Sequence, residues 1–350
     1  STAADADPAV YGPRGWFLEF RFSDLGDEDS RTRIQHPATL QPGESRTYVI
    51  SIRVNKHPQD WIRTLTPYRN YFRSMYGGVH YRRDARPIRP VLMAVEHNVN
   101  SRNPYGWAGY PNQRPDQYTF KPWVDDIKQN DKWSRVMLWA PTGLYDQRLE
   151  LNLPFQFASK WVDDPNLNSA MDEQDGFPSI KSSGMTLGLW WGRAVQIART
   201  WNPEVMENFD PENRDHREAA FREMDIAVQA GATDIGLDTF HHTVTPVWEL
   251  YPWLMTLRER YPNAKFCVEP IACDILHTQG AMFVLAWTTL LPQNATSNWS
   301  WVQTPYYLAD FLNPGHESWA AMSYHVHRSR GLNITSAMVQ SETERIASLG

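Results

Sequence analysis

Short apolar segments alternate with longer amphipathic segments along most of the chain, and this alternation restricts its fold more than any other feature. Apolar runs of about four to eight residues are typical of buried strands. Predicted strands cover Pro90–Val95, Arg135–Ala140, Met185–Trp191, Asp234–Asp238, Lys265–Glu269 and Tyr306–Asp310. Helical periodicity predicts helices over Asp215–Ala230, Trp248–Arg260, Glu317–Arg330 and Ser336–Leu349. Strands that alternate with crossover helices pair in parallel, so the sequence predicts an α/β fold.

The spacing of these strands favours a barrel. The intervals between them leave room for a helix and a long strand-to-helix loop, which suits a (β/α)8 TIM-type barrel better than a compact doubly wound sheet. A complete barrel of this type has eight strands, and six are predicted here. A truncated barrel and a barrel with an irregular last part both stay open.

The N-terminal residues follow a different pattern. Trp16–Phe22 and Arg46–Val54 alternate apolar and polar residues, with a turn sequence between them. This alternation is typical of half-buried antiparallel strands, and two or three such strands do not form a stable sandwich alone. We therefore expect the remnant of an antiparallel β-sandwich over residues 1–55, a helical linker over 56–84, and the barrel domain over 85–350.

Net charge and hydropathy exclude some partners. The formal net charge is −6, with acidic and basic residues interspersed, which argues against a nucleic-acid partner. The longest apolar run, Gly280–Pro292, is shorter than the roughly 20 residues that span a bilayer, so no membrane segment is predicted. Sequons at Asn294, Asn298 and Asn333 favour a secreted or periplasmic protein. The sequence does not define an oligomeric state.

Aromatic residues make up 13% of the chain and include 16 Trp, which is enough for both core packing and ligand contacts. A flat indole ring matches the apolar face of a sugar ring. Trp107 lies in a polar, turn-rich stretch, and Trp190 and Trp191 end the third predicted strand. These three side chains are predicted to bind a carbohydrate substrate, with core packing as the alternative.

Carboxylates end four of the six predicted strands: Glu96, Asp238, Glu269 and Asp310. The active site of a barrel lies at the carboxyl ends of its strands, and glycoside hydrolysis needs two carboxyl groups across the scissile bond. Asp238 follows an apolar strand directly, so burying it without a role would be costly. The alternative for each of these residues is a structural carboxylate that caps a helix or pairs with an arginine.

These considerations assign roles within one predicted glycosidase site. Asp238 is the expected nucleophile, and Asp310 and Glu269 are the other candidate catalytic carboxylates. Glu96, Arg193 and His241 are expected to contact the substrate together with the three tryptophans.

Other catalytic chemistries find less support. The histidines show no tight ligand spacing, so no metal or other cofactor is predicted, although a metal-dependent hydrolase stays an alternative. A non-catalytic carbohydrate-binding or structural barrel is a second alternative. No nucleophile-elbow serine motif or glycine-rich phosphate loop is present in the sequence. Cys267 and Cys273 match no zinc motif.

Three segments resemble the α-galactosidase-like clan of glycoside hydrolases. Ser183–Trp191 resembles the third-strand segment of that clan, Arg86–Leu92 resembles the entry into its barrel, and Thr233–Asp238 resembles the fourth strand that carries its nucleophilic Asp. The resemblance implies a retaining mechanism in which Asp238 is the nucleophile. It also implies an acid/base at the end of strand six, nearest to Asp310.

The sequence departs from the clan at two places. Ala140–Tyr145 replaces a pair of acidic residues and a Trp after strand two, and Gly236 replaces a Lys two residues before the nucleophile. The α-amylase clan is similar in another respect, because it carries an Asp at strand four and an acid Glu at strand five, which match Asp238 and Glu269. Gly236 again departs, since that clan has an Arg there. Asp238 is common to both interpretations.

Overall fold

The computed structural model divides the chain into two compact units, Ser1–Val54 and Asn55–Gly350. The residues that it describes are 42–45, 56, 58–94, 98, 100–103, 105–107, 119–129, 132–143, 157–192, 194–198, 206–238, 240, 245, 247–269, 274–285, 311–321, 335–338, 340 and 344. The predicted sandwich strands of the first unit lie outside these residues.

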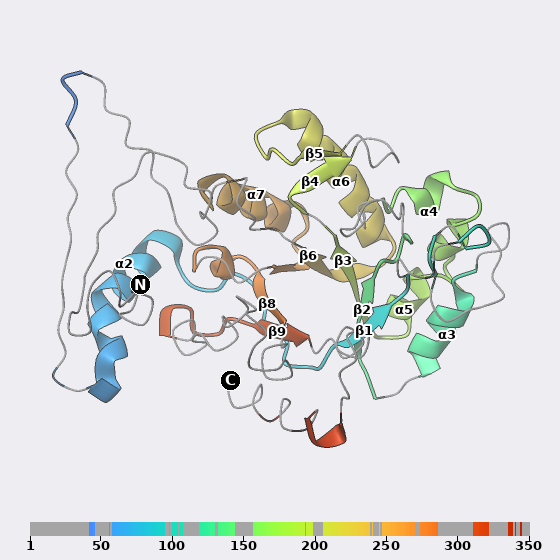
Figure 1. The fold of residues 1–350 in the computed structure, drawn as a ribbon, viewed down its shortest axis with the longest axis horizontal. Coiled ribbons are helices and arrows are strands. Elements are labelled where there is room, and N and C mark those ends of the chain that lie inside the picture. Colours follow the sequence, from blue (N-terminus) through green and yellow to red (C-terminus); the bar gives the residue numbers. More distant parts are fainter. Residues whose placement is uncertain are drawn as a thin grey trace, which may run out of the picture. The chain divides into compact units, whose positions relative to one another are not determined.

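The centre of the second unit is a seven-strand parallel sheet (Figure 1). In spatial order its strands are β1 (Arg89–Leu92), β2 (Arg135–Trp139), β3 (Thr186–Trp191), β6 (Ala232–Leu237), β7 (Lys265–Val268), β8 (Ala281–Leu285) and β9 (Ser318–Ala321). The sheet is strongly curled and forms a half-barrel, as in an incomplete TIM-like barrel. A short antiparallel hairpin of β4 (Gln196–Ala198) and β5 (Met206–Asn208) follows β3.

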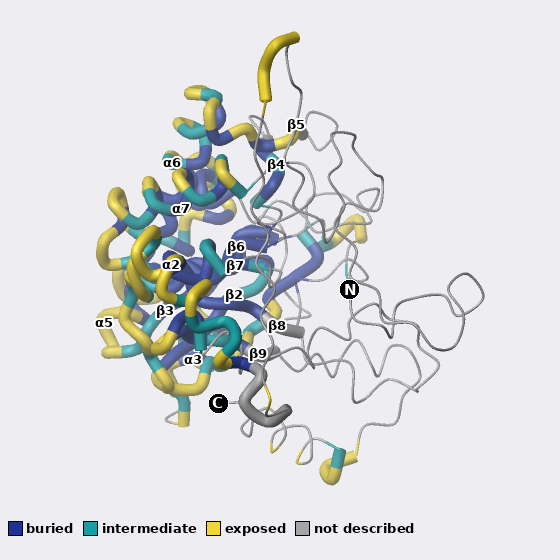
Figure 2. The backbone as a smooth tube through the Cα atoms, turned by 90° about the vertical axis from the view of Figure 1, so that its left-hand side faces the viewer, coloured by how far each residue is buried: buried dark blue, intermediate teal, exposed yellow. Residues whose placement is uncertain are grey.

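Helices pack on the outer side of the arc of strands (Figures 1 and 2). The helices are η3 (Pro58–Leu65), α2 (Thr66–Tyr76), α3 (Lys121–Gln129), α4 (Lys160–Asp163), η5 (Asn168–Met171), α5 (Pro178–Ser182), α6 (Arg214–Gln229), α7 (Val247–Arg260) and η7 (Leu276–Thr278). Helix α6 starts at a side-chain cap, where Asn213 accepts hydrogen bonds from the backbone N–H groups of Asp215 and His216. Among the described residues, no helix is long and apolar enough to span a membrane.

The structure confirms the first five predicted strands and the two helices α6 and α7, and it places η3 and α2 within the predicted helical linker. The described residues within Ser336–Leu349 are helical as well. The predicted strand Tyr306–Asp310 lies outside the described residues, and the sixth strand of the sheet is β8. The predicted helix Glu317–Arg330 is wrong at its start, because Ser318–Ala321 forms strand β9 against β8.

Alternate residues of each strand face opposite sides of the half-barrel. On the outer side, side chains such as Leu187, Leu189 and Phe266 pack in two clusters with the helices. On the inner side, six buried residues from five strands form a third cluster. They are Met137, Trp190, Cys267, Ala281, Phe283 and Trp319. Packed side chains therefore fill the interior, as in a closed barrel of this type.

Trp190 is one of the two tryptophans of this inner cluster, and it is 1% exposed. Its ring stacks on Trp139 with 4.3 Å between ring centroids and an interplanar angle of 13°, and it lies 4.5 Å from the ring of Phe283. Gly236 lies beside it in the next strand. A Cβ atom at residue 236 would lie 2.0 Å from the indole ring, which is well inside van der Waals contact. The position of Trp190 therefore requires glycine at residue 236.

We expect Gly236→Ala to destabilise the protein by about 2 kcal/mol or more, because the rigid indole has no space to retreat in the packed interior. Gly78→Ala is the matched control, since a Cβ there meets nothing within 4 Å. Urea unfolding, followed by tryptophan fluorescence, measures the free energy of unfolding of both variants. Equal stability of the two variants would contradict the close packing at Gly236.

Candidate active site

Asp238 directly follows β6 at the carboxyl end of the sheet. Its backbone N–H donates to the carbonyl of Trp191 at 2.9 Å, and its own carbonyl accepts from Ala194 at 2.8 Å. These bonds fix Asp238 beside the end of β3. Alternation along β6 places its side chain on the same inner face as Asp234 and Gly236, and the residue is only 7% exposed.

Glu269 stands in the same position at the end of β7. Its backbone N–H donates to the carbonyl of Leu237 at 3.1 Å, which continues the β6–β7 register by one residue and places Glu269 beside Asp238. Alternation puts its half-buried side chain on the inner face with Lys265 and Cys267. Burial raises the pKa of the Cys267 thiol, and nearby carboxylates that include Glu269 raise it further.

Asp238 and Glu269 thus form a pair of carboxylates on neighbouring strands. Parallel strands lie about 4.8 Å apart, and both side chains point to the interior of the half-barrel. A pair of this kind can supply one group that attacks or stabilises positive charge and one that transfers a proton.

An aromatic wall lies on the same inner face. Trp139, the last residue of β2, is partly exposed and covers the fully buried Trp190. Ala140 follows it with φ of 53°, and it is the non-glycine residue with positive φ in the described part of the chain. Such backbone conformations cluster at functional sites. Trp139 was not predicted as a site residue from the sequence, although alternation with Arg135 and Met137 places it on the inner face.

The predicted tryptophans occupy three different environments. Trp107 packs in the outer core, with ring centroids 5.4 Å from Phe120 and 5.3 Å from Trp123. Trp191 belongs to the outer cluster between β3 and the helices. Trp190 lies on the inner face beneath Trp139. Packing among the described residues explains the burial of Trp107 and Trp191, and their predicted sugar contacts stay predictions.

Four predicted site residues lie outside the described residues: Glu96, Arg193, His241 and Asp310. The structure thus brings together Asp238 and Glu269 and leaves the position of these four untested. Among the described residues, the sixth strand of the sheet is β8, which ends at Leu285.

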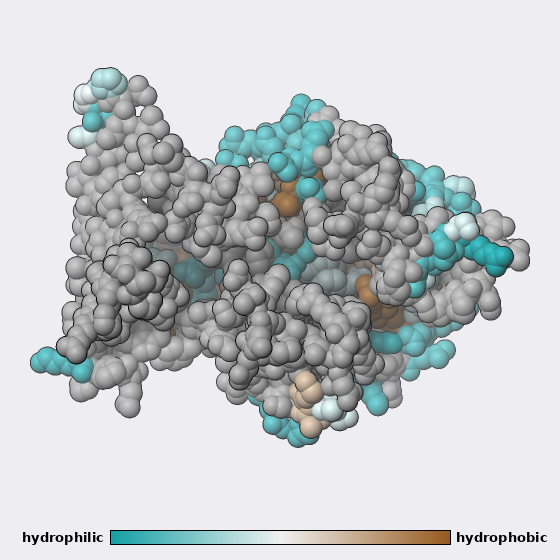
Figure 3. Space-filling view, viewed as in Figure 1, coloured by the Kyte–Doolittle hydropathy of each residue, from teal (hydrophilic) through white to brown (hydrophobic). Residues whose placement is uncertain are grey.

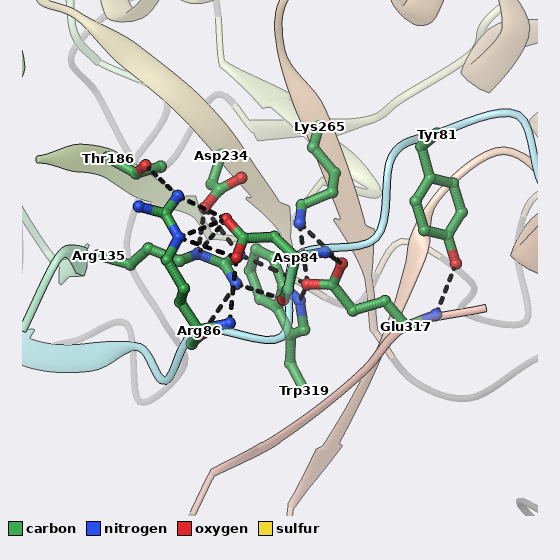
Figure 4. Close-up of polar contacts among 9 residues, drawn as sticks. All are labelled: Tyr81, Asp84, Arg86, Arg135, Thr186, Asp234, Lys265, Glu317 and Trp319. Carbon is green, nitrogen blue, oxygen red and sulfur yellow. Dashed lines mark hydrogen bonds and ion pairs between the residues drawn. The ribbon is translucent and has the colours of Figure 1, made fainter. Parts of the chain in front are cut away.

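A network of buried charges fills the opposite, amino end of the half-barrel (Figure 4). Arg135 on β2 is 1% exposed, and its guanidinium lies 2.9 Å from Asp234 on β6 and 3.4 Å from Glu317 before β9. It also donates to the carbonyl oxygens of Asp84 and Arg86 at 2.8 and 3.0 Å. One side chain thereby joins three strands and the segment that leads into β1.

Further contacts complete this network. Lys265 donates to both carboxylate oxygens of Glu317, at 2.9 and 2.8 Å, and Glu317 also accepts from the backbone of Asp84 at 2.8 Å. A side-chain hydrogen bond from Arg86 lowers the pKa of Asp84, whereas burial raises the pKa of Asp234 against the effect of Arg135. Because this end of a barrel usually carries stability rather than catalysis, we interpret the network as structural.

We expect Arg135→Met to destabilise the protein by about 3–5 kcal/mol, since Asp234 and Glu317 would remain buried without their cation. Arg89→Met is the control, because the Arg89–Asp126 pair is partly exposed and should cost about 1 kcal/mol or less. Urea unfolding at neutral pH measures the free energy of unfolding of both variants and of the wild type. A similar small loss in both variants would mean that the network contributes little.

Glu223 on α6 is another buried carboxylate, outside the half-barrel interior. Burial raises its pKa to about 7, although the backbone N–H of Ser159 donates to it at 2.8 Å and opposes the rise. It packs against the segment before α4, on the outer side of the sheet. A perturbed pKa is often a sign of a functional site, but Glu223 lies away from the strand ends that carry Asp238 and Glu269.

The raised pKa of Glu223 predicts a pH-dependent stability. The folded protein holds this proton up to about pH 7, while the unfolded chain releases it near 4.5, so stability falls as pH rises through this window. The loss amounts to about 3 kcal/mol. Glu223→Gln should remove this pH-dependent loss. The stability of the variant relative to the wild type should therefore be greater at pH 8 than at pH 4.5.

The control is Glu218→Gln, the same change at an exposed position of the same helix. Urea unfolding at a series of pH values from 4 to 8 measures the difference between each variant and the wild type. A constant difference across this range for Glu223→Gln would contradict the prediction.

The described residues show no candidate metal site, and a cleft opens at the end of the strands opposite the carboxylate pair. No group of three or more His, Cys, Asp or Glu among them could hold a metal ion. The described residues also line a cleft of about 570 Å³, which opens at the amino ends of the strands beside the ion-pair network.

No protein-family model matches the sequence, and no curated protein matches it.

Proposed function

We propose that this chain is a retaining glycoside hydrolase acting on an oligo- or polysaccharide, with Asp238 and Glu269 as its catalytic pair. The observation that carries the proposal is their position. They are neighbours in register, on the inner face, at the carboxyl ends of the fourth and fifth strands of the sheet.

In the proposed reaction, a carboxylate oxygen of Asp238 attacks the anomeric carbon of the sugar. The bond from that carbon to the leaving oxygen breaks, and Glu269 gives its proton to that oxygen. In the second step Glu269 takes a proton from water, and the water oxygen displaces Asp238 from the anomeric carbon. The result is hydrolysis with retention of configuration.

The strand spacing supports retention over inversion. Side chains that project from neighbouring parallel strands start about 4.8 Å apart. This is close to the roughly 5–5.5 Å between carboxyl groups in retaining enzymes, and below the roughly 6.5–9.5 Å that inverting enzymes need for a water molecule.

The strand count bears on the two clans that the sequence resembles. The α-amylase-like pattern, with Asp at strand four and Glu at strand five, agrees with Asp238 after β6 and Glu269 after β7. The α-galactosidase-like pattern needs an acid at strand six, which is β8 and ends at Leu285. We therefore favour Glu269 as the acid/base. We also propose Trp139 as the sugar platform, because it is the partly exposed member of the aromatic wall.

We expect Asp238→Asn to abolish turnover of aryl glycosides, because the amide does not attack the anomeric carbon. Glu269→Gln should slow hydrolysis of poor leaving groups by about 10²–10⁴-fold and spare dinitrophenyl glycosides, which leave without a proton. NMR of the first-formed product should show the retained anomer.

Asp126→Asn is the control, since Asp126 is an exposed partner of Arg89 far along the chain from the pair. Circular dichroism checks that each variant is folded. Full activity of Asp238→Asn, or an inverted product, would overturn the assignment. Binding of glycans by the wild type without any turnover would replace it with a carbohydrate-binding role.

A further inference from the structure

One cleft lined by described residues has no part in the proposed hydrolysis. Its volume is about 570 Å³, and it opens at the amino ends of β3, β6 and β7. Its walls are the segment His80–Arg86, which leads into β1, the residues just before β7, and the last turns of α7. Lys265, on its wall, is four residues before Glu269 along β7, or about 13 Å along the strand.

The lining of this cleft is strongly cationic. Five basic side chains line it against two carboxylates. The basic residues are Arg82, Arg83, Arg86, Arg258 and Lys265, and the acidic residues are Asp84 and Asp234. The whole chain carries a net charge of −6, so this excess of positive charge is a local feature.

Both carboxylates are already matched by cations. Asp84 lies 2.6 Å from Arg86, and Asp234 lies 2.9 Å from Arg135 behind the wall. Arg258, on α7, donates to the neutral side chain of Gln279. Lys265 is matched as well, because it lies 2.8 Å from Glu317, so the excess of positive charge in the lining comes mainly from Arg82 and Arg258.

The arrangement of the cations suits an oxyanion. Arg82 and Arg83 are exposed on one wall, and Arg258 is half-buried on α7. A guanidinium group presents paired N–H donors that match the oxygens of a phosphate or sulfate group. The volume lies within the roughly 300–1,000 Å³ of small-molecule sites, which is much more than one inorganic ion fills.

We propose that this cleft binds a small organic molecule that carries a phosphate or sulfate group. The arginines hold the oxyanion, and the remaining polar wall accommodates the organic part. The cleft lies apart from Asp238 and Glu269. Ligand binding there can therefore be measured whether or not the chain hydrolyses glycosides.

Isothermal titration calorimetry tests the proposal with four probes: glucose 6-phosphate, glucose 6-sulfate, unmodified glucose and inorganic phosphate, all at equal ionic strength. We expect one or both esters to bind, to exceed inorganic phosphate in affinity, and to raise the Tm, while glucose does not bind at the cleft. The relative affinity of the two esters distinguishes phosphate from sulfate as the preferred group.

Arg82→Gln should weaken ester binding by about tenfold or more, as expected for the loss of a charge-assisted hydrogen bond, and Arg82→Gln with Arg83→Gln should weaken it further. Arg73→Gln, an exposed arginine of α2 outside the cleft, is the matched control and should leave it unchanged. Failure of both esters to bind, binding no tighter than inorganic phosphate, or an equal loss in Arg73→Gln would each overturn the proposal.

Discussion

The buried guanidinium of Arg135 is the interaction on which the shape of the sheet depends. A seven-strand half-barrel has two edges, β1 and β9, and unpaired edges are sites of aggregation. Arg135 reaches from β2 to Asp234 on β6 and Glu317 before β9, while Glu317 accepts from the segment that enters β1 (Figure 4). Side chains thereby link the two edges at the amino end, where no backbone pairing between β1 and β9 is present among the described residues.

The inner side chains of the curled sheet lie in layers along the strands. Along β6 the inner residues are Asp234, Gly236 and Asp238, and along β7 they include Cys267 between Lys265 and Glu269. The same two strands thus carry charge at both ends and small side chains in the middle. The aromatic rings of Trp190 and Phe283 fill the space over the small residues and separate the two charged ends with apolar material. On the face of the molecule shown in Figure 3, the described residues are mostly hydrophilic, and hydrophobic residues are visible in only a few places.

The sequence predicted the parts of this fold that local pattern determines. Five apolar runs became strands, and the carboxylates that end the fourth and fifth lie side by side because register follows from parallel pairing. Strand β9 was missed, since Ser318–Ala321 has no local strand signal and is held by pairing with β8 and by the contacts of Glu317. The ion-pair network was also missed, because its members are separated by many residues along the chain and no spacing rule connects them.

Trp107 shows a different limit of sequence reasoning. Its polar, turn-rich surroundings suggested an exposed ring, yet the indole is in the core. The side chain of Asn103 explains this, because it accepts from the backbone N–H of Trp107 at 3.1 Å and donates to its carbonyl at 3.0 Å. The polar side chains of the turn form hydrogen bonds with the backbone groups of the same turn. The indole ring of Trp107 can therefore pack inward without leaving these groups unpaired.

The contact between Gly236 and Trp190 has a consequence for how this chain can diverge. A side chain of any size at residue 236 needs the space that the indole fills, so a basic residue there is compatible only with a smaller residue at 190. Loss of the indole first would leave a cavity between Trp139 and Phe283, and growth at 236 first would collide with the ring. Each single step passes through a less stable intermediate. Homologous chains are therefore expected to keep both residues or to replace both, so that positions 190 and 236 covary.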